Sequence, residues 1–324
     1  MILSGDIGGT KVRLAFFEEG GGRILVDEQR FASREFSDFS TLLKQYLRDK
    51  REKKISSACF GIAGPVRGGV CKATNLPWEI SAADIEKGLN IPKVHLINDL
   101  EANAWGLNEL SPEEFYVVNV GVQEKGHKAL ISAGTGLGEA GIFWDGKSHH
   151  PFACEGGHSD FAPTDDDEIE LLKYLMRLYK HVSYERVLSG PGLYQIYRFL
   201  IDTAREEESS TVAALMQQGD GPQIISEKGA SGECRACARA CRMFIEIYGA
   251  EAGNVALKFF AVGGVFLGGG IIPNLLPFIK EGNFIKTFID KGRLSSVLLQ
   301  IPVKVVLNVK TGLLGAARFA RENR

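Results

Sequence analysis

The chain lacks an excess of basic residues. Its 38 Lys and Arg residues face 40 Asp and Glu residues, and the formal net charge is -2. Nucleic-acid-binding domains usually carry a clear positive excess. No apolar run approaches the roughly 20 residues of a membrane helix, and the first residues show no charged segment followed by an apolar signal core. We therefore expect a cytoplasmic protein with neither a nucleic-acid nor a membrane partner.

Cysteine and proline are also scarce. Six cysteines among 324 residues do not describe a disulfide framework. Cys234, Cys237 and Cys241 have the spacing of half a zinc site, but the stretch is strongly helical and offers no clear fourth ligand, which favours structural cysteines. Against 11 prolines stand 38 glycines, clustered at 5–9, 134–141, 156–157 and 263–270. Glycine clusters at the ends of apolar runs suggest loops where the backbone comes close to a ligand.

Apolar periodicity predicts an α/β fold. Strand patterns alternate with helical ones, and the strands are rich in β-branched residues, which is typical of a partly parallel sheet. Both halves open with a strand, a glycine hairpin and a strand, which suggests two related halves. The acidic run 165–170 predicts a helix start with a solvated face. We expect strands at 1–7, 12–16, 23–31, 55–62, 94–97, 115–120, 129–132, 140–144 and 303–309, and helices at 39–47, from 81, from 165, and at 183–189, 192–207, 210–218, 233–260 and 312–321.

One polar pair stands where an apolar run meets a helix-prone segment. Asn98 and Asp99 follow the run from Val94 to Ile97. In an α/β protein, polar side chains at the carboxyl end of a strand point into the ligand crevice. The same position also suits a plain helix cap. The pair alone does not decide between these two roles.

Three glycine motifs carry further chemistry. In the first, at 5–11, Gly8 and Gly9 let backbone amides approach an anion, Thr10 adds a hydroxyl, and Asp6 suits a Mg²⁺ held mainly through water. A tight hairpin with a surface Asp is the alternative. The second, at 132–138, repeats these features with Gly134, Thr135 and Gly136; it is no P-loop, because no Gly-Lys-Ser/Thr ends it, and it also suits a plain hairpin.

The third glycine motif runs from Gly263 to Asn274. An apolar run there ends in three glycines, Gly268 to Gly270, and Pro273 can open the next helix. A flat apolar ligand such as a nucleobase could lie against these glycines. Spacing alone favours close helix–strand packing instead.

Taken in order, these motifs resemble the sugar kinases of the actin and hexokinase superfamily and, more narrowly, the bacterial ATP-dependent glucokinase family. The resemblance covers nearly the whole chain. It also includes the stretches Cys154-Glu155-Gly156-Gly157-His158-Ser159-Asp160, Glu185-Arg186-Val187-Leu188-Ser189-Gly190-Pro191-Gly192 and Gly312-Leu313-Leu314-Gly315. It implies two actin/hexokinase-like (ribonuclease H-like) domains around a deep cleft. One would be a small α/β domain, 1–110 with the C-terminal helix 310–324; the other would be a large α+β domain, 111–309.

The resemblance also implies an activity and a role for each matched residue. The protein would transfer the γ-phosphate of ATP to the 6-hydroxyl of glucose, the first step of glycolysis, and would form a homodimer. Asp99 would be the general base, and Asp6 would help to place Mg²⁺. Glucose hydroxyls would be bound by Asn98, Asp99, Glu155, His158 and Glu185, with Thr74 and Asn75 lining the pocket. The phosphates and the nucleoside of ATP would lie against Gly8, Gly9, Thr10, Gly134, Thr135, Gly136, Gly263, Gly264 and Gly268.

Rival functions stay open at this point. The acceptor could be another hexose or an N-acetylated amino sugar, and ADP or polyphosphate could be the donor. A non-catalytic sugar-sensing regulator is a third possibility, but such repressors usually carry an N-terminal DNA-binding domain, whereas the phosphate motif here begins at residue 5. The related repressor and open-reading-frame kinases carry a cysteine-rich zinc motif after the glutamate–histidine segment. Its absence favours the glucokinase branch, although Lys11 is more typical of the other branch.

Overall fold

The computed structural model describes residues 1–20, 23–50, 52–73 and 76–323. Thr74 and Asn75, which the sequence places in the sugar pocket, lie outside them. The chain divides into two compact units, one of Met1–Pro112, His150–Ala153 and Asn308–Arg324, the other of Glu113–His149 and Cys154–Leu307. The domain boundaries expected near 110 and 310 stay a prediction. No helix in the described part of the chain is long and apolar enough to span a membrane.

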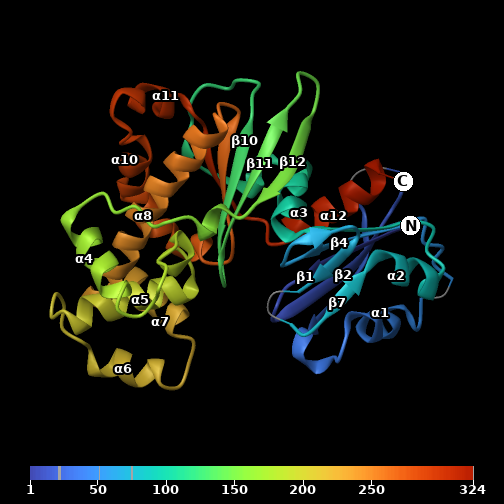
Figure 1. Ribbon diagram of the computed structural model, residues 1–324, viewed down its shortest axis with the longest axis horizontal. Helices are drawn as coiled ribbons and strands as arrows, with labels where there is room; N and C mark the ends of the chain where they lie inside the picture. Colours follow the sequence, from blue (N-terminus) through green and yellow to red (C-terminus); the bar gives the residue numbers. More distant parts are fainter. Residues whose placement is uncertain (21–22, 51, 74–75, 324) are drawn as a thin grey trace. The chain divides into compact units, whose positions relative to one another are not determined.

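The first unit is built on a five-stranded sheet in the order β3-β2-β1-β4-β8 (Figure 1). The central strand β1 runs antiparallel to β2 and parallel to β4, which is itself parallel to β8. A small sheet, β5-β6-β7, was not expected from the sequence. The strands are β1 Ile2–Ile7, β2 Lys11–Phe17, β3 Leu25–Ala32, β4 Ser57–Ile62, β5 Val66–Arg67, β6 Val70–Lys72, β7 Glu79–Ser81 and β8 Val94–Asn98; the helices are α1 Phe39–Leu47, α2 Ala82–Leu89, α3 Asp99–Gly106 and α12 Thr311–Glu322, with 3-10 turns η1 Ser33–Glu35, η2 Leu107–Glu109 and η3 Pro112–Glu114.

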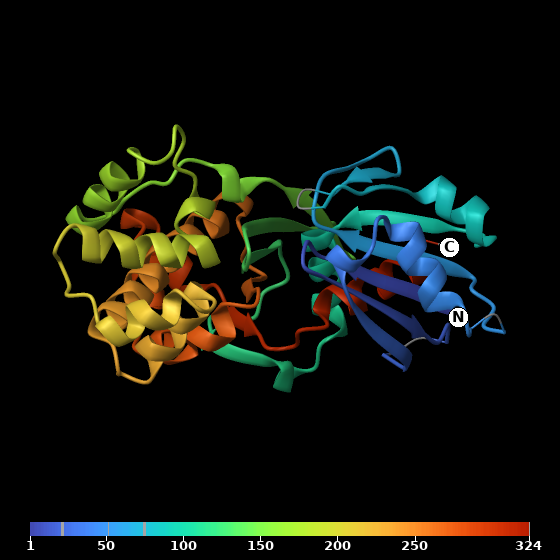
Figure 2. The ribbon, with the colours of Figure 1, turned by 90° about the horizontal axis from the view of Figure 1, so that it is seen from below.

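Alternation along β1 gives each face of this sheet its own core. Leu3 and Ile7 belong to the apolar cluster that also contains residues of α1 and α2. Ile2 belongs to the opposite cluster with α3 and α12, and Ser4 on the same face donates to the carbonyl of Leu313 at 2.6 Å. Successive side chains of a strand point to opposite faces, so α1 and α12 cover opposite sides of the sheet, as Figure 2 shows in blue and red. Asp6 is an even-numbered residue of β1 and therefore lies on the α12 side.

The second sheet has the order β12-β11-β10-β13-β14-β9. Its central strand β10 is antiparallel to β11 and parallel to β13, which is parallel to β14. The first five strands thus repeat the order of the first sheet, as the two glycine hairpins in the sequence suggested, and the expected α/β fold is confirmed. The strands are β9 Phe115–Asn119, β10 Lys128–Ala133, β11 Leu137–Trp144, β12 His149–Cys154, β13 Gly264–Gly268 and β14 Val303–Val306.

The long helix α8, Arg235–Phe259, is the centre of the second core (Figure 1). It packs beside β10, and the hydroxyl of its buried Tyr248 donates to the carbonyl of Ile131 at 2.8 Å. It ends at Phe260, whose left-handed backbone (φ 47°) closes the helix, so the following strand starts only at Gly264. The other helices are α4 Asp166–Leu175, α5 Gly190–Asp202, α6 Ser210–Met216, α7 Gly221–Ala230, α9 Leu276–Lys280, α10 Asn283–Ile289 and α11 Ser295–Gln300, with 3-10 turns η4 Gly156–His158, η5 Tyr184–Arg186, η6 Ile272–Leu275 and η7 Gly292–Leu294. The helix that Pro273 could open is η6 and α9, whereas α7, α10 and α11 were not expected.

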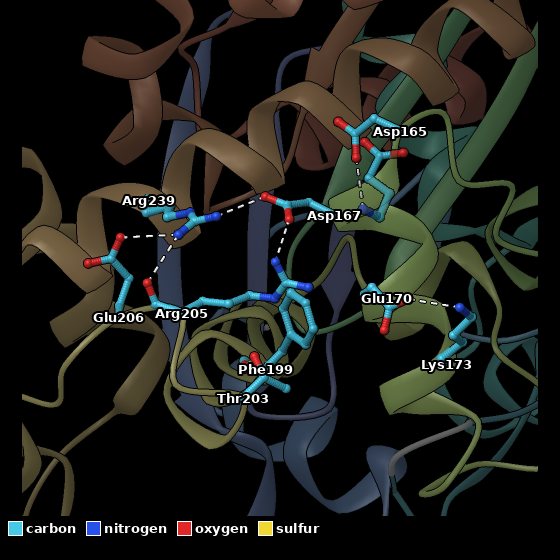
Figure 3. A network of polar contacts seen from close by, with 10 residues as sticks. Asp165, Asp167, Glu170, Lys173, Phe199, Thr203, Arg205, Glu206 and Arg239 are labelled. Carbon is cyan, nitrogen blue, oxygen red and sulfur yellow. Dashed lines mark hydrogen bonds and ion pairs between the residues drawn. The ribbon is translucent and has the colours of Figure 1, made fainter.

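The acidic run 165–170 begins a helix as expected, and Asp165, Asp166 and Glu170 are exposed, as a solvated face requires. Asp167 and Glu168 were not expected to turn towards the protein. Asp165 caps α4 by accepting from the Glu168 N–H at 2.8 Å. Asp167 accepts from Arg205 at 2.7 Å and from Arg239 at 2.8 Å, so it joins the end of α5 to α8 (Figure 3). Glu168 is buried and accepts from the N–H and the hydroxyl of Thr164. The acids at 167 and 168 therefore hold the fold together.

Helices α3 and α12 approach each other closely because glycine faces backbone at their crossing. A Cβ on Gly315 would lie 1.7 Å from the carbonyl oxygen of Ala102, and one on Gly106 would lie 2.0 Å from that of Thr311. Neither neighbour is a flexible side chain that could move aside. The segment that delivers Asn98 and Asp99 is thereby locked against the C-terminal helix.

We expect Gly315→Ala to lower the free energy of unfolding by roughly 1–3 kcal/mol, because overpacking forces a backbone shift. Gly88→Ala is the matched control, since no atom lies within 4 Å of a Cβ at that helical position. It should be stabilising by about 0.5–1 kcal/mol. Urea unfolding followed by circular dichroism measures both. Equal stability of Gly315→Ala and the natural chain would show that the two helices are not in close contact.

Candidate active site

The first unit places Asp6 and Asn98 at one edge of its sheet. Three neighbouring parallel strands end together, since Ile7 is paired with Ile62 and Ile62 with Asn98. Carboxyl ends of parallel strands are where open α/β sheets bind ligands. The glycine hairpin 8–10 continues from the same edge. Its turn is held by Ser33, whose hydroxyl donates to the carbonyl of Gly8 at 2.9 Å.

Asp6 is half-buried beside this hairpin. Burial raises the pKa of its carboxyl above the ordinary value, and the positive charge of Arg13 on the paired strand acts in the opposite direction. Thr10, at the tip of the hairpin, is exposed. The edge thus presents one carboxylate, a hydroxyl and a glycine turn. The structure brings together Asp6, Gly8, Gly9 and Thr10, as the sequence predicts.

The helix cap at the end of β8 is Asn98 and not Asp99. The side-chain oxygen of Asn98 accepts from the N–H groups of Leu100 at 2.9 Å and Glu101 at 3.4 Å. Its amide nitrogen donates to the carbonyl of Gly64 at 3.3 Å, which leaves one N–H for a ligand. Asp99 is the first residue of α3, half-buried, and one of its oxygens accepts from the Leu100 N–H at 3.0 Å.

Gly61 gives this corner its geometry, and the sequence analysis assigned it no role. A Cβ at Gly61 would lie 2.8 Å from the Cβ of Ala102 and 3.6 Å from the Cα of Asp99. Only a glycine on β4 lets the first turn of α3 lie this close to the sheet. The sequence shows Gly61 only as a glycine near the end of a strand, where it cannot be told apart from an ordinary turn glycine.

In the second unit the hairpin 134–136 is tied to the start of helix α5. The Gly134 N–H donates to the carbonyl of Gly136, and the Gly190 N–H donates to the carbonyl of Gly134, both at 2.8 Å. Ser189 caps α5 by accepting from Gly192 at 3.0 Å. A Cβ at Gly134 would meet nothing within 4 Å. A helix start beside open glycine backbone suits an anion such as phosphate.

Glu185 touches the same hairpin. One of its oxygens accepts from the Leu137 N–H at 3.1 Å, and a Cβ at Gly136 would lie 2.4 Å from that oxygen. Gly136 is therefore needed for the carboxylate to reach the backbone. The sequence assigned Glu185 to sugar binding and Gly136 to phosphate binding, and the structure makes them direct neighbours.

Glu155 and His158 lie at the two ends of the turn η4, beside the segment that carries Glu185. The imidazole Nε2 of His158 is 4.0 Å from the Glu155 carboxylate, and their side chains are 60% and 69% exposed. A β-bridge joins Asp160 to Ser183, so the segments 155–160 and 183–185 run together. The second unit therefore groups two carboxylates and an imidazole, largely open to solvent, next to a glycine hairpin.

The third glycine motif is split by strand β13. Gly268 is paired with Ser132, just before the hairpin 134–136, and a Cβ on the following Gly269 would lie 2.0 Å from the Ala133 carbonyl oxygen. Gly263 and Gly264 lie at the other end of the strand, about 13 Å away at about 3.3 Å per residue. A Cβ on Gly263 would lie 2.5 Å from the Gly126 carbonyl oxygen. The structure does not bring Gly263 and Gly264 to the hairpin, and close packing accounts for Gly263.

The three cysteines of α8 are buried thiols. Cys234 is the N-cap and accepts from the Cys237 N–H at 3.3 Å. Burial raises the pKa of Cys241 to about 12, which disfavours the thiolate that a metal needs. Within the described residues, no three His, Cys, Asp or Glu side chains form a metal-holding group.

Replacement of Asn98 tests which residue caps α3. We expect Asn98→Ala to lower the free energy of unfolding by about 0.5–2 kcal/mol, because two amides lose their acceptor. Asn98→Asp should recover only part of the stability, since a carboxylate accepts from the same amides but cannot donate to the Gly64 carbonyl. Asp99→Asn leaves the cap in place and should cost less than about 1 kcal/mol. Denaturant unfolding of the three variants checks this, and a larger loss for Asp99→Asn than for Asn98→Ala would contradict the assignment.

Comparison with known proteins agrees over the whole chain. A family model described as Glucokinase matches residues 3–323. A glucokinase of Nostoc sp. (strain PCC 7120 / SAG 25.82 / UTEX 2576) is 38% identical over an alignment 337 positions long. The alignment covers 99% of this chain and 98% of the relative.

Two solved structures have the same fold. Glucokinase from an Antarctic psychrotroph aligns with a TM-score of 0.85 at 30% identity and covers 99% of both chains. Glucokinase from Balamuthia mandrillaris, solved in complex with glucose, aligns with a TM-score of 0.84 over 99% of this chain and 93% of that one, and at 22% identity it bears on the fold alone. The chain that carries these two hairpins and the Glu155–His158 turn belongs to the glucokinase family.

Proposed function

We propose that this protein is an ATP-dependent glucokinase, which transfers the γ-phosphate of ATP to the 6-hydroxyl of glucose and releases glucose 6-phosphate and ADP. The observation that carries the proposal is the bond between Glu185 and the Leu137 N–H at 3.1 Å. It places a group suited to sugar hydroxyls against a hairpin suited to phosphate. Membership of the glucokinase family supports the same reaction.

Sugar recognition rests on polar side chains, because glucose carries no charge. Glu155, His158 and Glu185 offer two carboxylates and an imidazole for its hydroxyls. Among the described residues, one side-chain N–H of Asn98 donates to the Gly64 carbonyl, and the other is available to a sugar hydroxyl. A site that hydrogen-bonds hydroxyls strongly rejects analogues that lack them, because its polar groups would then stay unpaired. Strictness for glucose over other hexoses is best tested with initial rates on a panel that includes mannose, fructose and N-acetylglucosamine.

Asp99 is the proposed general base. It lies at the first turn of α3, half-buried, with one oxygen already bonded to the Leu100 N–H. That bond orients the carboxylate group, which would accept the proton of the 6-hydroxyl. Phosphoryl transfer asks little covalent chemistry of a protein, since positioning and charge neutralisation contribute most.

The metal that the family implies is Mg²⁺, and the residues fit it. Mg²⁺ keeps several waters and uses one or two carboxylates with substrate phosphates rather than an all-protein cage. Asp6 is a half-buried carboxylate beside the 8–10 hairpin, and the described residues contain no group of three acidic, His or Cys ligands. Asp6 would hold the ion mainly through water, and the ion would neutralise phosphate charge. Gly8, Gly9, Thr10, Gly134, Thr135, Gly136 and Gly268 would lie along the nucleotide.

The proposal also includes a metabolic role, a cellular location and an oligomeric state. Glucose phosphorylation would be the first step of glycolysis in the cytoplasm, and the protein would act as a homodimer, as the resemblance implies. Sedimentation of the purified chain tests the dimer. A coupled assay that compares ATP, ADP and polyphosphate, with and without Mg²⁺, tests the phosphoryl donor and the metal.

We expect Asp99→Asn to lower kcat by about 10²–10⁴-fold, because the general base is lost. Glucose binding, measured by calorimetry, should persist. Asp84→Asn is the matched control: Asp84 is also an aspartate in the first turn of a helix of the same unit, and it is exposed. It should turn over normally. Turnover of Asp99→Asn close to that of the natural enzyme would refute the assignment of the base.

A further inference from the structure

Two buried carboxyl groups lie beneath the Glu155–His158 turn. Glu139 on β11 is 2% exposed and Glu251 on α8 is 0% exposed. The Glu251 carboxylate accepts from the amide nitrogen of Asn254 at 2.8 Å and from the ammonium of Lys258 at 3.2 Å. Buried carboxylates are costly unless paired and hydrogen-bonded, and Glu251 has such partners.

Glu139 lacks such a set of partners. Its Oε1 is buried and has no donor among the described residues. Burial, followed by the charge of Glu251, raises the pKa of Glu139 to about 8, while Lys258 acts in the opposite direction. Glu139 is therefore protonated at neutral pH, and its O–H can donate to the Glu251 carboxylate. Two adjacent acids that share one proton avoid the repulsion of two like charges.

The turn that carries Glu155 and His158 rests directly on Glu139. A Cβ on Gly156 would lie 1.8 Å from the Oε2 of Glu139, and one on Gly157 would lie 2.1 Å from the carbonyl oxygen of Leu137. The turn has no side chains of its own at 156 and 157 with which to anchor itself. Its position is set by what lies underneath.

The same acid pair reaches the Glu185 segment. Asn254, which donates to Glu251, also donates to the hydroxyl of Tyr184 at 3.1 Å. Tyr184 immediately precedes Glu185. The pair therefore contacts both segments that carry the sugar-binding candidates of the second unit.

Few other titratable groups face the pair. They come from each element packed around it: Cys154 of β12, Tyr184 of η5, Tyr248 and Lys258 of α8, and Lys291 after α10. Burial raises the pKa of the three weak acids among them, Cys154, Tyr184 and Tyr248. Burial lowers the pKa of Lys291, and the charge of Glu251 acts in the opposite direction. Glu155 and His158 of the turn itself complete the set. Because Lys291 and His158 can also titrate, Glu139→Gln is needed to isolate the contribution of Glu139.

We propose that Glu139, packed under Gly156 and hydrogen-bonded to Glu251, is a positioning residue that holds the Glu155–His158 turn in the geometry for sugar binding. Ionisation of Glu139 places two negative charges under the turn and displaces it. This role rests on the proposed function, because it assigns sugar binding to the turn. Glu139 itself does not touch the sugar.

The pH dependence of stability has a definite sign. In the unfolded chain the Glu139 carboxyl has its ordinary pKa of 4.5, whereas in the folded chain it keeps the proton up to about pH 8. Between these values the folded state binds more protons, so stability falls as pH rises. Below and above the window, this group adds no pH dependence.

The test compares Glu139→Gln with the natural chain. Glutamine keeps the shape and a donor for Glu251 but does not titrate. The unfolding equilibrium constant of the natural chain should rise relative to that of Glu139→Gln by up to about tenfold per pH unit between about pH 5 and pH 8. The KM for glucose of the natural chain should rise about tenfold above pH 8, as expected for the loss of one buried hydrogen bond. The variant should show no such rise, and kcat should change little in either protein.

Two further variants complete the test. Glu139→Leu removes the donor and should raise KM at every pH, so recovery in Glu139→Gln separates hydrogen bonding from bulk. Glu168→Gln is the control, because Glu168 is also a buried acid of the second unit with a raised pKa but bonds Thr164 instead. It should alter stability and leave glucose affinity unchanged.

The two proposals fail in distinguishable ways. If glucose binds and is phosphorylated but the KM of Glu139→Gln follows that of the natural chain at every pH, the positioning role is wrong and the kinase function stands. If the pH dependence of stability is the same in both proteins, the shared proton is wrong. If no hexose is phosphorylated, the proposed function fails, and with it the positioning role.

Discussion

The contact on which the second unit depends is the bond from the Leu137 N–H to the Glu185 carboxylate, at 3.1 Å. It forms only because residue 136 has no side chain. Through this bond the hairpin is fixed to the segment 183–185, which is bridged in turn to 155–160. A displacement of any one of these three segments would move the others. The groups proposed to bind phosphate and those proposed to bind sugar thus share one rigid support.

Both units use the same solution for bringing backbone close to a ligand. Each has a central strand that turns through a glycine hairpin into an antiparallel neighbour, with parallel strands on the other side. The parallel ladder aligns strand ends, so side chains far apart in sequence meet at one edge. In the first unit this brings Asp6 and Asn98 to the ends of the two strands that flank β4. Close approach of α3, permitted by Gly61, then sets where Asp99 stands.

Much of this could be predicted from the sequence, and the failures have physical causes. Both hairpins and the α/β fold follow from glycine placement and apolar periodicity. The glycines at 263–264 and at 268 look alike in sequence, yet they lie at opposite ends of one strand, and only tertiary packing separates them. The sequence allowed a helix cap at Asp99, and the structure places the cap one residue earlier, on Asn98; both residue types accept from helix amides, so the residue types alone do not decide. Helices α7, α10 and α11 are short, and their apolar patterns are too brief to be distinguished from those of loops or strands.

Glu139 shows where sequence reasoning necessarily stops. A single acid within an apolar strand resembles the solvent-facing member of an alternating pattern. That Glu139 is buried, and that it faces Glu251 of α8, is known only from the structure. Replacing a buried charged pair by well-packed apolar residues is often neutral or stabilising, so stability alone does not explain the Glu139–Glu251 pair. The Glu139–Glu251 pair lies beneath a turn whose central residues, Gly156 and Gly157, have no side chains to hold the turn in place. A protonated acid that donates to a neighbouring carboxylate fills the space under the turn, and its hydrogen bond also fixes its orientation. Because Glu139 is titratable, the folded chain loses stability as the pH rises towards 8.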